Sequence, residues 1–175
     1  MGLPTSPHRR YDPLSDQWVL VSAGRTKRPW LGHKERRVVV DDRPPYDPEC
    51  YLCPGNTRAS GATNPAYAST FVFTNDFAAL RPDGADEHLH DGLLVAEAQP
   101  GTCRVVCFSP RHALRLTRLP LQGVRELIDL WATQSTELGA RYRWVQIFEN
   151  RGEAMGASNP HPHGQIWSGA ALPDR

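Results

Sequence analysis

Only one segment of this sequence repeats apolar residues at the spacing of an α-helix. Within residues 120–141, the positions that recur every three or four residues are Leu121, Val124, Ile128, Trp131, Ser135 and Leu138. Pro120 stands at the beginning, where the first turn of a helix tolerates proline. Sixteen prolines and fourteen glycines favour turns and loops in the rest of the chain. The sequence therefore predicts a single long amphipathic helix in a fold built mainly from other elements.

The other regular elements are short runs of β-branched and aromatic residues, which are typical of strands. The runs cover residues 17–22, 38–40, 70–74, 93–98, 102–108, 144–148 and 161–167. Gln99-Pro100-Gly101 suggests a hairpin, and the polar stretch 81–91 suggests an exposed loop with His88 and His90 in solvent. This order predicts an α+β fold, a mostly antiparallel sheet with the helix packed on it. The 175 residues have the size of one domain.

Charge and hydropathy exclude several classes of partner. The formal net charge is +1, from 20 basic and 19 acidic residues. The chain therefore lacks the broad basic surface by which proteins bind nucleic acid or an anionic membrane. No stretch approaches the roughly 18 to 20 apolar residues of a membrane-spanning helix, and the N-terminal residues do not resemble a signal peptide. We therefore expect a cytoplasmic protein that binds any anion locally.

Two of the four cysteines occur as Cys50-x-x-Cys53 within residues 41–64, a segment interrupted by prolines at 44, 45, 48 and 54. Such irregular backbone needs an outside clamp. In a cytoplasmic chain this spacing points to metal or redox chemistry before it points to a disulfide. Cys103 and Cys107 lie in the apolar run 102–108, so we expect them in the core.

The pair His161-Pro162-His163 is the most informative feature for function. In a strand, residues two apart project from the same face, about 6 to 7 Å apart along the chain. Pro162 favours this extended backbone because it fixes its own φ angle and moves the preceding residue out of the helical region. The sequence thus predicts two imidazoles side by side. For an isolated His-x-His, two surface histidines in a turn would be the better interpretation.

The neighbours of these histidines favour a site for a phosphoryl group. Asn150, Gly152, Gly156 and Ser158 precede them in a loop whose amides can donate to phosphate oxygens. Gln165 repeats the spacing of two residues, so we expect its amide on the same face as the imidazoles. Imidazole, hydroxyl and amide groups on one side indicate a phosphoryl site rather than a metal site alone.

Five segments of the sequence together resemble one known family. They are Ser6–Tyr11, Gly24–Trp30, Cys50–Gly55, Phe71–Leu80 and Phe148–Trp167. In this order they are similar to the galactose-1-phosphate uridylyltransferases, a branch of the histidine-triad superfamily. Agreement of five segments in register is not expected by chance. The resemblance implies a histidine-triad-like half-barrel of antiparallel strands with one helix packed on it.

The resemblance implies a reaction in two transfers. His163 attacks the α-phosphorus of UDP-glucose or UDP-galactose, releases hexose 1-phosphate, and carries the uridylyl group until another hexose 1-phosphate accepts it. His163 must be neutral to attack, and a hydrogen bond from its other ring nitrogen would hold the required tautomer. Gln165 stands where histidine-triad hydrolases carry a third histidine. A sugar phosphate leaves without a proton, because its second pKa is about 6, so Gln165 favours transfer over hydrolysis.

The resemblance also implies the substrate-binding residues by position. Asn75 and Asp76 match residues that contact the uridine. Phosphate and nucleotide contacts are implied for Asn150, Gly156, Ser158 and Gln165. Arg25 and Arg28 match basic residues that reach the nucleotide across a homodimer interface. The alternative for these two arginines is an ordinary solvated basic loop.

A structural zinc site is implied by the same resemblance. Its ligands are Cys50, Cys53, His112 and His161. Two thiolates and two imidazoles complete a tetrahedral set of ligands, which indicates an ion that clamps the proline-rich segment to the strand bearing His163. A reduced, metal-free pair of cysteines is the alternative.

Members of this family continue for a second half of similar size, whereas this sequence ends at Arg175. That half supplies much of the hexose recognition and an iron site, and neither carries over to this sequence. An expressed fragment, a truncated product and a free-standing domain with a partner all remain open. Two rival functions also remain: a sugar-nucleotide phosphorylase that transfers an adenylyl group, and a non-catalytic, zinc-stabilised nucleotide-binding module.

Overall fold

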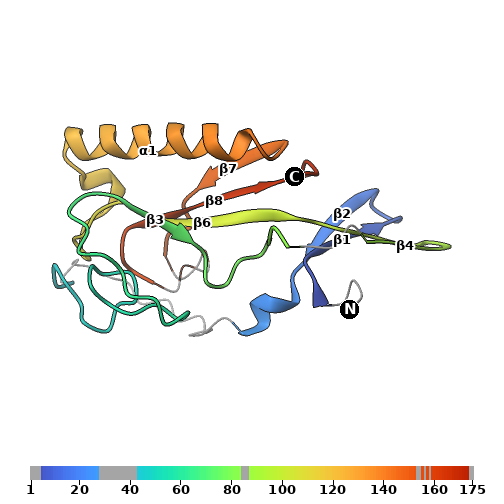
Figure 1. Ribbon diagram of the computed structural model, residues 1–175, viewed down its shortest axis with the longest axis horizontal. Coiled ribbons are helices and arrows are strands. Elements are labelled where there is room, and N and C mark those ends of the chain that lie inside the picture. Colours follow the sequence, from blue (N-terminus) through green and yellow to red (C-terminus); the bar gives the residue numbers. More distant parts are fainter. Residues whose placement is uncertain are drawn as a thin grey trace.

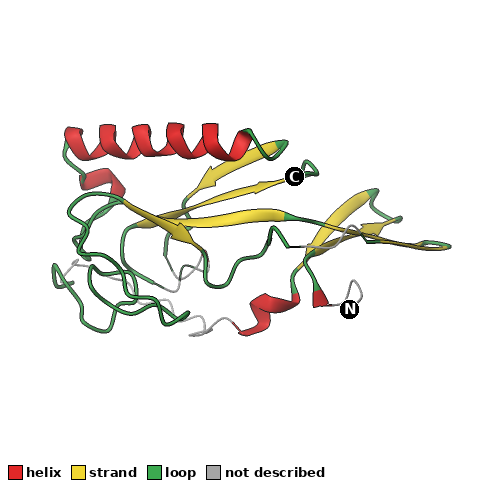
Figure 2. Cartoon of the chain, in the orientation of Figure 1, coloured by secondary structure: helices red, strands yellow, loops and turns green. Residues whose placement is uncertain are grey.

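The computed structural model describes residues 5–27, 43–83, 87–152, 155, 157 and 159–173, and Figures 1 and 2 show its arrangement. Its strands are β1 (His8–Asp12), β2 (Gln17–Val21), β3 (Phe71–Thr74), β4 (His88–Asp91), β5 (Leu94–Ala98), β6 (Gly101–Cys107), β7 (Trp144–Phe148) and β8 (His163–Gly169). The α-helix of the described residues is α1 (Leu121–Gly139), and short 3₁₀ segments cover Ala23–Lys27 and Leu116–Arg118. The predicted α+β class is confirmed. The predicted strand 38–40 lies outside the described residues.

The first sheet has the strand order β2-β1-β5-β4, and each neighbouring pair is antiparallel. The sequence pattern missed β1 and was wrong about β4, which it assigned to a loop. Turns with positive φ close both hairpins, at Asp16 (53°) and Gly92 (58°). All four side chains of β4 are exposed, as expected for His88 and His90. Backbone pairing with β5 stabilises β4. Because its side chains are exposed, its sequence lacks the alternation of apolar residues that would predict a strand.

The second sheet has the order β3-β6-β8-β7 and is also antiparallel. In Figure 1, α1 lies along one side of this sheet and the segment 43–69 lies on the other. Val106 and Ile166 pack with Leu127 of α1, whereas Val105 and Cys107 pack with the segment 43–69. The second sheet is therefore the middle of three layers.

Strands β5 and β6 belong to different sheets, so the hairpin predicted around residues 99–101 is wrong. Strand β5 pairs with β1 and β4, while β6 pairs with β3 and β8. Figure 1 shows the chain continuing from β5 into β6 without reversing. Gly101 permits this close crossing, because a Cβ atom there would lie 2.3 Å from the carbonyl oxygen of Ser168. Proline and glycine mark a change of sheet here rather than a turn.

Helix α1 confirms the predicted helix, and Trp131 and Leu138 of its predicted face pack in the core, but two other predicted residues do not. The buried residues are Leu127, Gln134 and Leu138. Leu121 is 68% exposed and Ile128 is 51% exposed. Gln134 can be buried because Arg104 of β6 donates a hydrogen bond to its Oε1. Within the described part of the chain, none of the helices could span a membrane.

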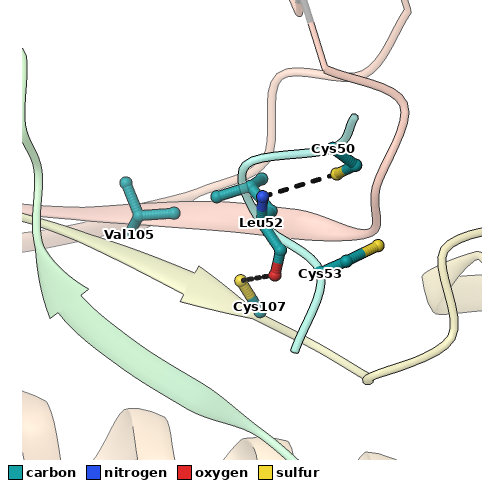
Figure 3. Close-up of a cluster of buried hydrophobic side chains, with 5 residues drawn as sticks. All are labelled: Cys50, Leu52, Cys53, Val105 and Cys107. Atoms are coloured by element: carbon teal, nitrogen blue, oxygen red, sulfur yellow. Dashed lines mark hydrogen bonds between the residues drawn. The ribbon is translucent and has the colours of Figure 1, made fainter. Parts of the chain in front are cut away.

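The segment 43–69 docks on the second sheet through a small buried cluster, which Figure 3 shows. Its members are Cys50, Leu52, Cys53, Val105 and Cys107. The N–H of Leu52 donates to Cys50 Sγ at 3.4 Å, and the thiol of Cys107 lies 3.9 Å from the carbonyl oxygen of Leu52. Cys103 and Cys107 are fully buried, which confirms their predicted place in the core.

Candidate active site and metal centre

Strand β8 presents its side chains alternately to the two faces of the second sheet. Ile166 is buried against α1, so His163, Gln165 and Trp167 project from the opposite face. In register, His163 lies beside Cys107 and Gln165 beside Val105. Both β6 residues pack against the segment 43–69. The structure therefore brings His163 and Gln165 together on the face that adjoins the proline-rich segment.

The half-buried imidazole of His163 is oriented by the backbone. Its Nδ1 atom lies 2.8 Å from the carbonyl oxygen of His161. A carbonyl oxygen only accepts hydrogen bonds, so Nδ1 carries the proton and Nε2 of the neutral ring carries the lone pair. This hydrogen bond therefore selects the tautomer in which Nε2 can act as a nucleophile.

His161 lies just before β8 begins, so the predicted strand 161–167 starts two residues too early. The residue is 1% exposed. Its Nδ1 lies 3.6 Å from Cys53 Sγ, and its Nε2 lies 2.9 Å from the carbonyl oxygen of Ser109. The ring of His161 therefore belongs to a cluster of potential metal ligands, while its backbone carbonyl orients His163.

Four buried side chains could together hold a metal ion. They are Cys50, Cys53, His112 and His161. One ligand atom from each residue lies within 4.8 Å of all the others. Cys53 Sγ lies 3.6 Å from Nδ1 of both His112 and His161. The fold thus brings together the predicted ligands from three separate parts of the chain.

Groups outside this cluster lie against its imidazoles, with hydrogen bonds to His161 and a carboxylate near His112. Nε2–H of His161 donates to Ser109 and also lies 3.1 Å from the hydroxyl oxygen of Tyr67. The Tyr67 hydroxyl donates in turn to a backbone carbonyl in the Cys50–Cys53 turn at 2.6 Å. Nε2 of His112 lies 3.9 Å from a carboxylate oxygen of Asp47. Both rings direct Nδ1 at Cys53. Groups that contact the outer ring nitrogen of a metal-ligating histidine commonly fix its orientation in this way.

Burial determines the protonation of the cluster. It lowers the pKa of His161 to about 3, and the neighbouring His112 adds to the effect. Burial also lowers the pKa of His112 and raises the pKa of the Cys53 thiol to about 11. The imidazoles are therefore neutral at pH 7, as metal binding requires, whereas a bound cation has to displace the proton of Cys53.

Asn75 and Asp76 follow β3 directly, in the turn that the sequence predicts. The N–H of Asn75 donates to the carbonyl oxygen of Cys103 at 2.9 Å, and its side-chain oxygen accepts from the amide two residues on. The Asp76 carboxylate lies 3.5 Å from Arg58, whose guanidinium stacks 4.1 Å from the ring centroid of Phe73. Asn75 therefore stands beside β6, one strand away from β8.

Arg25 is brought to the same face as Gln165. Its guanidinium carbon lies 5.8 Å from a ring centroid of Trp167, and the indole N–H of Trp167 donates to Gln165 Oε1 at 3.0 Å. Asn150 is exposed, just beyond β7. The other predicted contacts, Arg28, Gly156 and Ser158, lie outside the described residues.

Three side chains support the site without having been singled out in the sequence. Tyr67 contacts the ring of His161. Arg43 donates to the carbonyl oxygen of Pro160 and, at 3.4 Å, to that of Ala113, so it braces the backbone beside both histidine ligands. Asn159 contacts Cys50. Only Asn159 has a sequence signal, since an asparagine commonly bonds the backbone two residues further on.

Known proteins resemble this chain over nearly its whole length. The family model for the N-terminal domain of galactose-1-phosphate uridyl transferase matches residues 4–173. Galactose-1-phosphate uridylyltransferase of Haemophilus influenzae is 54% identical over 169 residues, 96% of this chain and 48% of that protein. The protein of the same name from Rattus norvegicus is 51% identical, over 95% of this chain and 44% of its own length.

A solved structure described as that of a uridylyltransferase has the same fold. It superposes with a TM-score of 0.68 at 22% sequence identity, over 95% of this chain and 47% of that one. This chain spans about half the length of the curated relatives it matches. Because the family model covers nearly every residue, the chain belongs to the galactose-1-phosphate uridyl transferase family and corresponds to its N-terminal domain.

Proposed function

We propose that this chain carries the nucleotide-transfer site of a UDP-glucose–hexose-1-phosphate uridylyltransferase of galactose metabolism, with His163 as the nucleophile. The observation that carries the proposal is the 2.8 Å hydrogen bond from His163 Nδ1 to the carbonyl of His161, which leaves the lone pair on Nε2. Family membership supports the reaction class. This chain matches only about half the length of its relatives. We therefore propose recognition of the accepting hexose 1-phosphate for a full-length protein of the family and not for this domain alone.

In the first transfer, Nε2 of His163 forms a bond to the α-phosphorus of UDP-glucose, and the bond from that phosphorus to the bridging oxygen breaks. Glucose 1-phosphate leaves with the electron pair. In the second transfer, a phosphate oxygen of galactose 1-phosphate attacks the same phosphorus, the phosphorus–nitrogen bond breaks, and UDP-galactose leaves. Nδ1 keeps its proton throughout, so His163 returns to its starting tautomer.

Gln165 has the role of holding the phosphoryl oxygens. Its Oε1 accepts from the indole N–H of Trp167 at 3.0 Å, and because an indole N–H only donates, the amide NH₂ remains for the phosphoryl group. A sugar phosphate has a second pKa of about 6, so it departs at pH 7 without being protonated. A neutral donor is sufficient here, which supports transfer over hydrolysis.

The remaining substrate contacts are proposed by position in the family. Asn75 and Asp76 contact the uridine. The phosphates are contacted by Asn150, Gly156, Ser158, Arg25 and Arg28. The two arginines reach either the site of their own chain or the site of a partner in a homodimer. The position of Arg25 over Trp167 supports a place for its charge beside the phosphoryl group.

The ion proposed for the four-residue cluster is zinc. With metal–sulfur distances of about 2.3 Å and metal–nitrogen distances of about 2.0 to 2.1 Å, tetrahedral ligands of the two kinds lie about 3.6 Å apart. Cys53 Sγ lies 3.6 Å from both imidazole nitrogens, which fits this geometry. When bound, zinc supplies a structural cross-link that neutralises the thiolates. The residues of the cluster hold the segment 43–69 to the start of β8, and no step of the reaction passes through them.

Trapping of the nucleotidyl group tests the proposal and separates it from its rivals. The zinc-loaded chain would be incubated with UDP-glucose or with ADP-glucose and examined by intact mass spectrometry. We expect a mass increase of one uridylyl group with UDP-glucose and a much smaller adenylyl yield. Labelling mainly by ADP-glucose would identify an adenylyl-transferring phosphorylase. A folded sample that binds UDP-glucose without any mass increase would indicate a non-catalytic nucleotide-binding module.

A further inference from the structure

Asn159 connects the metal cluster to the backbone that precedes the nucleophile. The residue is 8% exposed. Its Oδ1 accepts from the N–H of His161 at 2.9 Å, and its Nδ2 lies 3.5 Å from Cys50 Sγ. One amide therefore contacts a sulfur of the cluster and the backbone of a histidine ligand, which lie 111 positions apart in sequence.

The backbone contact fixes which end of this amide faces the sulfur. The two side-chain atoms of Asn159 lie at 3.5 and 3.6 Å from Cys50 Sγ, so these distances alone do not distinguish oxygen from nitrogen. The N–H of His161 can only donate, so the atom that it contacts is Oδ1. Nδ2–H is then the donor to the sulfur. Cys50 Sγ accepts a second N–H from Leu52 at 3.4 Å.

His161 is consequently held at three points. Asn159 accepts from its N–H, Cys53 contacts Nδ1 of its ring, and Ser109 accepts from Nε2. The next residue, Pro162, is held as well, because its carbonyl accepts from the N–H of Phe108 at 2.9 Å. The carbonyl of His161 is thereby fixed, and it is the acceptor that selects the tautomer of His163. A displacement of this peptide of about 1 Å is enough to cost a reaction of this kind about 100-fold.

We propose that Asn159 is a positioning residue, whose amide transmits the position of the cluster to the His161 carbonyl and so sets the tautomer of His163. The proposal rests on the proposed function only where it concerns the rate of uridylyl transfer. Its structural part concerns the protonation pattern of His163 and the donor to Cys50, and both can be measured without any reaction.

The variant Asn159→Ala removes both contacts, whereas Asn159→Asp keeps the oxygen that accepts from His161 but loses the donor to Cys50. Ser168→Ala is the matched control, because Ser168 is a fully buried polar residue of β8 whose hydroxyl donates to the carbonyl oxygen of Thr102 at 3.3 Å. Each protein would be prepared with zinc and, separately, with cobalt in the cluster. Nitrogen-15 spectra of the imidazoles report the His163 tautomer, and the sulfur-to-cobalt charge-transfer band reports the donors to the thiolates.

In the wild type and in Ser168→Ala, we expect His163 to be protonated at Nδ1 and the cobalt band to be the same. Asn159→Ala should show a mixed tautomer and a band shifted to lower energy. Asn159→Asp should keep the Nδ1 tautomer but shift the cobalt band. This second variant still tests the proposal if the alanine variant does not fold. Wild-type spectra in both variants would overturn the proposal, and so would loss of the Nδ1 tautomer in Asn159→Asp.

The rate of labelling by UDP-glucose gives a third readout. In zinc-loaded Asn159→Ala, uridylyl transfer should slow by about 10- to 100-fold, the range found when outer partners of metal ligands are removed. The affinity for UDP-glucose should change little, since Asn159 acts through His161. An unchanged rate together with unchanged spectra would contradict the positioning role. Failure of the wild type to become labelled would count against the proposed function, while the two spectra would still decide the role of Asn159.

Discussion

Cys53 Sγ and His161 Nδ1 lie 3.6 Å apart, although their residues are separated by 108 positions in sequence. This contact joins the segment 43–69 to the residues that lead into β8. That segment contains no α-helix or named strand, and its backbone hydrogen bonds belong to turns and an isolated bridge. The cluster that Cys53 shares with Cys50 and the two histidines adds a contact between this segment and the rest of the fold.

Replacing Cys53 should remove the metal and much of the stability. In Cys53→Ala we expect less than stoichiometric zinc and a loss of at least about 4 kcal/mol in the free energy of unfolding, as for other lost metal sites. Cys103→Ala is the matched control, because Cys103 is equally buried but lies outside the cluster. Zinc analysis and urea unfolding with and without a chelator would measure both effects. Stoichiometric zinc in Cys53→Ala would contradict the assignment of the ligands.

Two adjacent residues of α1 test which face of the helix is buried. Leu127 is fully buried in the core cluster, whereas Ile128 is 51% exposed. Leu127→Ala should therefore lower the free energy of unfolding by about 2 to 5 kcal/mol. Ile128→Ala should change it by less than about 0.5 kcal/mol. Urea titrations of the two variants compare them directly, and a larger effect at Ile128 would show that the helix is rotated.

The metal-free chain should lose stability as the pH falls below neutrality. His161 has a pKa of about 3 in the fold, against an ordinary value of 6.5, so between these values the unfolded chain binds more protons. The contribution is complete above pH 6.5 and is lost progressively as the pH is lowered toward 3. Its slope is at most about 1.4 kcal/mol per pH unit.

Urea unfolding of the chelator-treated chain between pH 7 and 5 would measure this slope. His161→Gln should flatten it. His90→Gln should leave it unchanged, since His90 is exposed on β4. A slope that is the same in His161→Gln and in the wild type would mean that the buried imidazole does not cause it.

Complementation between two variants can decide whether Arg25 serves the site of its own protomer or that of a partner. If its charge serves the phosphoryl group, Arg25→Ala should slow labelling by UDP-glucose by about 10- to 100-fold, the value of a hydrogen bond to a charged group. Arg118→Ala, at an exposed arginine, should have no effect. Mixing Arg25→Ala with His163→Ala chains restores labelling only if the arginine of one protomer reaches the site of its partner. Full labelling by Arg25→Ala alone would identify an ordinary solvated arginine.

Elements with an alternating or helical apolar pattern could be predicted from the sequence, and the others could not. Residues 144–148 form the predicted strand, and α1 falls within the predicted helix. Strand β4 was missed because its side chains are all exposed. The predicted face of α1 wrongly included Leu121 and Ile128 and omitted Gln134, whose burial is stabilised by Arg104, a partner from another strand. Such partners are tertiary features, which local sequence does not encode.

The candidate site was predictable at the level of residue identity but not of contact. The four potential metal ligands were implied by the family resemblance, and the fold brings them together. The resemblance also implied separate roles for His161 and His163, but it did not give the hydrogen bonds that orient each ring. The decisive acceptor for His163 is a backbone carbonyl, and every residue has one. Tyr67 contacts His161 from 94 positions away, and no motif in the sequence singles it out.

The central claim is that Nε2 of His163 carries the uridylyl group, and mapping of the trapped adduct tests it most directly. The zinc-loaded chain would be labelled with UDP-glucose, digested under neutral conditions and sequenced by mass spectrometry, with His163→Ala and His90→Ala in parallel. We expect one uridylyl group on His163 in the wild type, the same in His90→Ala, and no label in His163→Ala. Equal labelling of His163→Ala, or an adduct mapped to another residue, would contradict the account.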